Sequence, residues 1–114
     1  MPLRLTPDML AAGYDFLRET QPFKGWKLPP AEEVGFCVIR ARDVFADCGI
    51  ENGVPMIRVS EARNGYSATL LATLAHEMCH LRQFRIGDSG NHNALFGRLA
   101  RAVCRAHGFD IRCF

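Results

Sequence analysis

Two histidines and a glutamate lie within one short stretch of the chain, His76-Glu77-Met78-Cys79-His80. In an α-helix, residues four apart lie on the same face, so the rings of His76 and His80 would reach one ion together. Glu77 would lie roughly 100° around the helix from His76, which puts its carboxylate beside that ion. Neutral imidazoles suit zinc, and a neighbouring carboxylate can take a proton from zinc-bound water. The H-E-x-x-H pattern therefore predicts a zinc site with its own general base.

The residues around this motif predict the helix that carries it. An apolar stripe recurs at helical spacing on the side away from the histidines, formed by Leu70, Leu74, Met78 and Leu81. The histidine side carries small or polar residues, which are Thr69, Ala72, Thr73 and Gln83. Such side chains leave room for a metal ion and a substrate. We expect this helix to span residues 66–86, with Gly87 as its natural end.

A catalytic zinc ion takes three protein ligands and leaves one position for water, so a third ligand is needed. The candidates that follow the motif are Asp88, His92, His107 and Asp110. His92 is the best placed, because it opens the last helix after a short loop that can fold this helix back beside the motif. Asp88 lies in the turn itself and is a weaker alternative, and His107 lies about 22 Å further along the helix. Cys79 could also approach the metal, but we expect it to pack in the core, as free cysteines usually do.

The rest of the chain predicts the elements that position these residues. A first helix begins at Thr6, with Pro7 in its first turn, and ends near residue 19 or 20. Strands are expected over residues 34–40, 43–50 and 55–60, with Asn52-Gly53 as a hairpin turn. Their short connections predict an antiparallel meander. A last helix is expected over residues 91–107, followed by an extended tail over 109–114.

These elements predict an α+β fold, with three helices packed on a small three-stranded, mainly antiparallel sheet. The 114 residues are enough for a single domain over residues 1–114. The net charge of +2 is too small to indicate nucleic-acid binding by itself. No apolar stretch approaches the ~20 residues of a membrane span, and no leader pattern opens the chain. Five cysteines without a C-x-x-C argue against a disulfide framework and favour buried free thiols in the cytoplasm.

Two segments of the chain resemble the SprT-like zinc metallopeptidases. They are residues 76–83, HEMCHLRQ, and residues 87–96, GDSGNHNALF. By this resemblance, His76, His80 and His92 match the zinc ligands and Glu77 matches the catalytic glutamate. The resemblance also implies a minimal zincin fold, and the best-known members are DNA-dependent proteases that degrade proteins crosslinked to DNA. The chain departs from the family in Asn93, where a glycine is usual, and in having no C-terminal zinc ribbon.

The first functional hypothesis is peptide-bond hydrolysis assisted by one zinc ion. Glu77 would accept a proton from the attacking water and later pass it to the leaving amine. A polypeptide substrate could add as a strand to the third predicted strand, whose candidate substrate contacts are Met56, Arg58 and Ser60. The candidate donors to the oxyanion are Arg63, Tyr66 and Arg82, and the sequence does not choose among them.

A second hypothesis is a DNA-binding module. Arg98, Arg101 and Arg105 fall on one side of the last predicted helix, where they could hold phosphates or simply form a solvated face. The two hypotheses are compatible, because a protease activated by DNA needs both functions. A third hypothesis is a metal-stabilised scaffold without activity, against which the intact Glu77 argues, since a structural site does not need that carboxylate.

Overall fold

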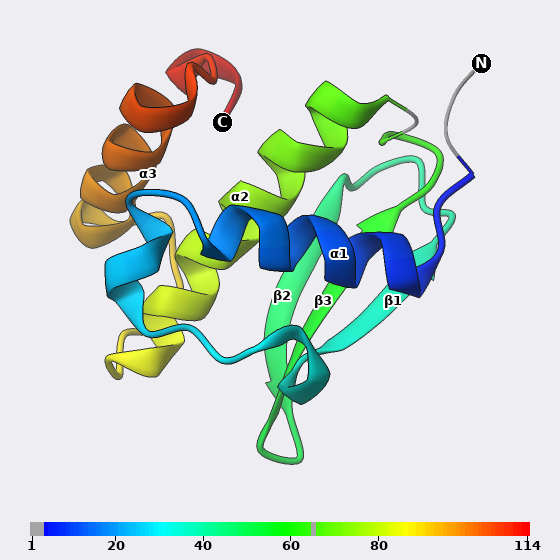
Figure 1. Cartoon of the computed structure of the whole chain (residues 1–114), viewed down its shortest axis with the longest axis horizontal. Helices are drawn as coiled ribbons and strands as arrows, with labels where there is room; N and C mark the ends of the chain where they lie inside the picture. The colour runs from blue at the N-terminus through cyan, green and yellow to red at the C-terminus, as the bar shows by residue number, and fades with distance from the viewer. Residues whose placement is uncertain (1–3, 65) are drawn as a thin grey trace.

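The computed structural model describes residues 4–64 and 66–114 and contains an α+β domain (Figure 1). Its helices are α1 (Pro7–Arg18), α2 (Ser67–Arg85) and α3 (Ala94–His107), and its strands are β1 (Gly35–Ile39), β2 (Ala46–Glu51) and β3 (Val54–Ser60). Helices α1 and α2 contact each other and the sheet, while α3 packs on α2 on the side away from the sheet (Figure 1). The expected three helices and three strands are therefore confirmed.

The order of the strands differs from the prediction. The sheet has the order β1-β3-β2, so β3 is central, pairs in parallel with β1 and pairs antiparallel with β2. The predicted hairpin is present at Asn52 and Gly53, which have positive φ angles of 52° and 79°. The predicted meander is wrong, because residues 40–45 carry the chain across one end of β3 and place β2 on its far side. The sheet is mixed.

Contacts from the end of β3 hold this crossing segment. The hydroxyl of Ser60 donates to the backbone oxygen of Ala41, and the side-chain amide of Asn64 donates to the oxygen of Phe45 over 3.0 Å. The guanidinium of Arg63 donates to the oxygen of Arg42 over 2.7 Å. Six residues can span the two strand spacings of nearly 5 Å each that separate β1 from β2. Residues 43–45 belong to this crossing, which is why β2 begins only at Ala46.

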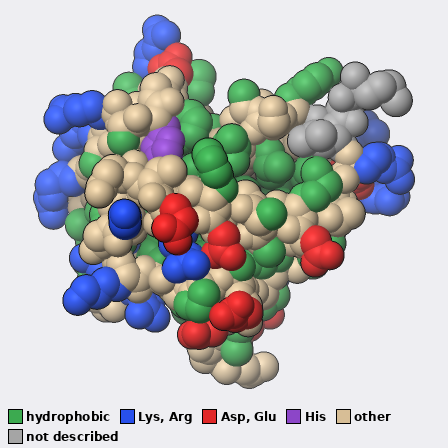
Figure 2. Space-filling model, viewed as in Figure 1, with side chains coloured by type: hydrophobic (Ala, Val, Ile, Leu, Met, Phe, Trp, Pro, Cys, Tyr) green, Lys and Arg blue, Asp and Glu red, His purple; other side chains and the backbone are tan. Residues whose placement is uncertain are grey.

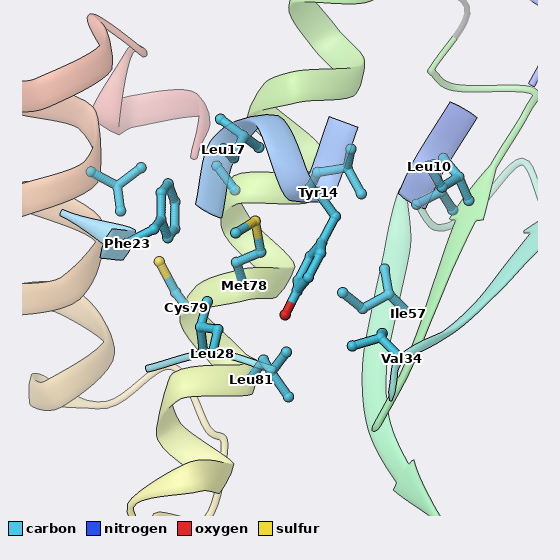
Figure 3. Packing of buried hydrophobic residues seen from close by; sticks show 14 of the residues in the cluster. Leu10, Tyr14, Leu17, Phe23, Leu28, Val34, Ile57, Met78, Cys79 and Leu81 are labelled. Atoms are coloured by element: carbon cyan, nitrogen blue, oxygen red, sulfur yellow. The ribbon is translucent and has the colours of Figure 1, made fainter. Parts of the chain in front are cut away.

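The core lies between the helices and one face of the sheet (Figure 3). Ile57 and Val59 of β3 are fully buried there, and the ring of Tyr14 on α1 fills the space between β1 and α2. The Tyr14 hydroxyl donates to the oxygen of Pro29 over 2.6 Å, which satisfies the one polar atom of this side chain. The opposite face of the sheet carries the ion pairs of Arg58.

The motif helix has the predicted faces. Its apolar stripe of Leu70, Leu74, Met78 and Leu81 is buried. Cys79 is fully buried as well, which confirms that it is a packing residue. Cys79 and Cys104 are buried, but Cys37 and Cys48 are only half-buried and Cys113 is exposed, and all five thiols are free.

The last helix ends at His107, as predicted, but starts later than predicted. It begins at Ala94, because the side chain of Asn93 caps it by accepting a bond from the backbone N–H of Phe96 over 3.0 Å. Its buried residues are Phe96, Ala100, Val103 and Cys104, whereas Ala102 and Ala106 are exposed. The expected extended tail contains a 3₁₀ turn over Ile111–Cys113, because Asp110 caps it. None of the described helices has both the length and the apolarity that a membrane crossing requires.

Candidate metal centre

The three predicted histidines converge. His76 and His80 project from one face of α2, and His92 comes from the loop that precedes α3. One ligating atom from each residue lies within 4.8 Å of the others, and the Nε2 atoms of His80 and His92 are 3.0 Å apart. The three residues are half-buried, buried and exposed respectively, so the group opens towards solvent on one side. These histidines could hold a metal ion.

Two of the rings have a defined tautomer. Nδ1 of His76 lies 2.9 Å from the backbone oxygen of Phe114, and Nδ1 of His80 lies 2.7 Å from the side-chain oxygen of Gln83. Because these oxygens can only accept, each Nδ1 carries the hydrogen and each Nε2 keeps its lone pair. A hydrogen bond at Nδ1 is the usual support for a histidine that binds metal through Nε2.

Gln83 connects His80 to the loop that carries His92. Its side chain is fully buried, and its amide nitrogen donates to Asp88 Oδ2 (2.9 Å), to the backbone oxygen of Asn91 (2.7 Å) and to Asn93 Oδ1 (3.2 Å). These three acceptors orient the amide so that its oxygen points at His80. Asn91 and Asn93 flank His92 in the chain, so one side chain sets the position of two candidate ligands.

The alternative ligands have other partners. The carboxylate of Asp88 accepts bonds from the backbone N–H of Gly90 and from the side chain of Asn93, which lower its pKa and fold the loop. The described residues that form the candidate metal group are the three histidines, without Asp88. His107 lies away from them, with Nε2 2.9 Å from the hydroxyl of Thr20.

The environment of His76 and His80 keeps these two rings neutral. Burial, together with the neighbouring His80 and His92, lowers the pKa of His76 to about 4. Burial also lowers the pKa of His80, although its bond to Gln83 opposes this. Both rings therefore lack the second proton at neutral pH. Each has a free nitrogen lone pair, so no proton has to leave before a cation binds. The phenyl ring of Phe96 packs against all three imidazoles, with centroids 4.5–5.0 Å away.

Glu77 lies beside this group on the sheet side of α2. Its side chain is buried, and burial raises its pKa to about 8, with a smaller contribution from Asp47. A carboxyl in this state is protonated at neutral pH in the metal-free protein, and a nearby dication would favour the carboxylate. The donor set, three imidazoles with a carboxyl adjacent, fits a zinc ion.

Glu77 and His76 also line a cavity of about 580 Å³. Its other walls come from α2, from the end of the crossing segment and the start of β2, and from the C-terminal turn; they are Phe45, Ala46, Ala68, Thr69, Ala72, Thr73, Cys113 and Phe114. Three of the four small or polar residues expected on the histidine side thus line an open space. The fourth, Gln83, supports His80 instead.

The structure contradicts the expected strand addition at β3. Both edges of β3 are already paired, so an additional strand has no free backbone groups there. The side chains of Met56, Arg58 and Ser60 point to the face opposite the core, since Ile57 and Val59 point into it. Arg58 binds Asp47 and Glu51, Ser60 binds Ala41, and Met56 lies over Gly35. These residues support the sheet.

The remaining predicted residues are distributed over the surface. Arg98, Arg101 and Arg105 are exposed on α3, and Figure 2 shows Lys and Arg side chains gathered on the side of the molecule where α3 lies. Among the candidate oxyanion donors, the guanidinium of Arg82 donates to the oxygen of Trp26 over 3.0 Å, and Arg63 is used in the crossing segment. Tyr66 is exposed.

Sequence reasoning did not identify the contribution of the C-terminal turn. Phe114 supplies the oxygen that orients His76, and its ring centroid lies 5.3 Å from that of His76. No local pattern marks this contact, because the two residues are 38 positions apart. The chain matches no family model and no curated protein.

Proposed function

We propose that this protein is a zinc-dependent peptidase of the SprT-like type, with one Zn²⁺ held by His76, His80 and His92. The observation that carries the proposal is the convergence of three imidazoles beside a buried glutamate that borders an open cavity. A scaffold site would need only the ligands, whereas Glu77, which lines the same cavity as His76, is available as a general base. The mixed sheet and the helix α2 beside it are compatible with a minimal zincin fold.

Each residue of the centre has a distinct task in this proposal. A bound zinc ion would acidify a water molecule and polarise the carbonyl of the scissile peptide. Glu77 takes the proton from the attacking water and delivers it to the leaving amine. Burial raises the pKa of Glu77 and a bound dication would favour its carboxylate, so the two effects oppose each other at this general base. Gln83 and the backbone of Phe114 hold the ligand rings in the required tautomer.

The test is a metal analysis combined with a proteolysis assay on casein. The purified protein should contain about one zinc ion per chain, and Glu77→Gln should keep the zinc while turnover falls by about 10²- to 10⁴-fold. Glu19→Gln, an equivalent change at an exposed glutamate just after α1, is the matched control and should retain full turnover. Undiminished proteolysis in Glu77→Gln would refute the assigned role.

The exposed arginines of α3 favour a second function, the binding of DNA. The bound DNA would activate the protease, or DNA binding would be the main activity of a metal-stabilised module. Arg98, Arg101 and Arg105 could contact successive phosphates. Replacing all three arginines with glutamate reverses their charge and should abolish DNA affinity. The DNA affinity of the unchanged protein should fall steeply as the salt concentration rises. Adding DNA to the casein assay separates an activator from an unrelated ligand.

We expect the protein to act in the cytoplasm, where its five thiols would stay reduced.

A further inference from the structure

We infer that a groove at the hairpin end of the domain binds a segment of a partner protein in which one Lys or Arg is flanked by apolar residues. The groove has a volume of about 810 Å³. It lies between the second half of α2, the strand ends near the hairpin turn and the 3₁₀ turn η2 (Ala31–Glu33). Neither the three candidate ligands nor Glu77 belongs to its walls, so the inference does not depend on the proposed function.

The inner walls of the groove are apolar. Leu81 and Phe84 of α2 form one side, and Ile50 and Val54, on the two strands of the hairpin, form another. Figure 1 shows this hairpin projecting from the rest of the domain, so its apolar residues extend beyond the helices that cover the rest of the sheet. Ile50 and Val54 are accordingly 47% and 45% exposed. An open space of this size, within the usual range for ligand sites, is large enough for one long side chain and the residues beside it.

The charges around the groove favour a cation. Glu32 and Glu33 of η2 are exposed on its wall, and neither carboxylate takes part in an ion pair with another described residue. Arg85 of α2 is the one basic residue among the walls, so the acidic charges exceed the basic charge by one. Figure 2 shows Asp and Glu side chains over the lower part of this face, above the projecting hairpin, and Lys and Arg side chains on the side of α3.

A Lys or Arg side chain matches both kinds of wall. Its apolar stem can pack on Val54 and Phe84, while its charged head reaches carboxylates at the edge of the groove. Apolar neighbours in the same segment then cover the exposed hairpin residues. Arg85 repels a second cation, so the groove selects a segment with a single basic residue over a basic run. Glu32 and Glu33 likewise repel phosphates, which separates this groove from the arginine face of α3.

The groove is tested with blocked pentapeptides of the sequence Ala-Leu-X-Leu-Ala, in which X is Lys, Gln or Glu. In an NMR titration of the ¹⁵N-labelled protein, the Lys peptide should shift the backbone amides of Val34, Gly35, Gly53 and Val54. It should bind at least about 5-fold more tightly than the Gln peptide, and the Glu peptide should bind most weakly. The affinity for the Lys peptide should fall as the salt concentration rises, because salt screens exposed charges. It should be the same with zinc and after a chelator has removed the metal.

Two double variants test the charges. Glu32→Gln combined with Glu33→Gln should weaken binding of the Lys peptide by about 5-fold or more and leave the Gln peptide unchanged. Glu19→Gln combined with Asp43→Asn removes the same net charge at two exposed positions outside the groove and should leave both affinities unchanged. Equal losses in the two double variants would overturn the assignment of the carboxylates.

A valine substitution tests the apolar wall. Val54→Ser should weaken binding of all three peptides by about 3-fold or more, because it removes apolar surface that the segment covers. Val44→Ser is the matched control, since this valine has a similar exposed fraction of 41% and lies outside the groove. Equal affinity for the three peptides would show that the groove takes any apolar segment and would overturn a cationic occupant. Amide shifts gathered around the metal centre would overturn the groove itself.

Discussion

The side-chain oxygen of Gln83 lies 2.7 Å from Nδ1 of His80, three residues earlier on the same helix. The contact uses the spacing of i and i+3 on a helix, which places the two side chains on one face. Because Gln83 also holds the loop on either side of His92, it determines how two candidate ligands from different segments meet. Gln83 is not one of the three candidate ligands, so its role would be to position them.

Replacing Gln83 with methionine should weaken zinc binding by about 10- to 100-fold, because partners of metal-binding histidines contribute this much to affinity. Methionine keeps the volume of the buried side chain but accepts no bond from His80 Nδ1 and donates none to the loop. Competition with a chromophoric chelator would measure the affinity. Gln21→Met, at an exposed glutamine, is the control, and an unchanged affinity in Gln83→Met would show that the contact is incidental.

Removing the metal should lower the stability of the protein. A ligand that binds only the folded state at 100 times its Kd adds about 2.7 kcal/mol to the free energy of unfolding. A chelator should therefore lower the thermal midpoint of the unchanged protein but not that of His92→Ala, which has lost one ligand. His107→Ala keeps all three ligands, so its midpoint should still fall when the chelator is added. A chelator effect that survives in His92→Ala would place the metal elsewhere.

The buried carboxyl of Glu77 should make the metal-free protein less stable as the pH rises. Its pKa is 4.5 in a model compound and about 8 in the fold, so the folded state holds a proton that the unfolded chain has released between these values. The contribution of this group to the free energy of unfolding therefore falls as the pH rises from about 4.5 to about 8. The free energy of unfolding in urea should be compared for metal-free Glu77→Gln and the metal-free unchanged protein. The variant should become more stable relative to the unchanged protein as the pH rises from 5 to 8.

Asn64 should be important for the stability of the fold. Its side chain is fully buried, donates to the oxygens of Phe45 and Ser60, and accepts from the hydroxyl of Thr73 over 2.6 Å. Asn64→Ala leaves these partners without it and should lower the free energy of unfolding by about 3 kcal/mol, at about 1 kcal/mol for each bond. Urea denaturation measures this change. Asn91→Ala, at an exposed asparagine, should change stability by less than about 0.5 kcal/mol.

Local patterns in the sequence were enough to predict the helices and the face that each side chain of α2 presents. The spacing of Leu70, Leu74, Met78 and Leu81 identified the buried side, and the interval between His76 and His80 placed two rings on the other. His92 could be chosen because a short loop limits where the chain can go after α2. These features depend on contacts between residues that are close in the chain, which is why periodicity and turn residues reveal them.

The order of the strands, the cavity and the partners of the histidines were decided only by the tertiary structure. Whether β1 lies beside β2 or beside β3 depends on how residues 40–45 cross, and that path is held by Ser60 and Asn64 from a distant part of the chain. The contact of Phe114 with His76 joins segments that no repeating pattern links. Sequence periodicity specifies which face of an element is buried, but the partner on that face depends on the packing of the whole chain.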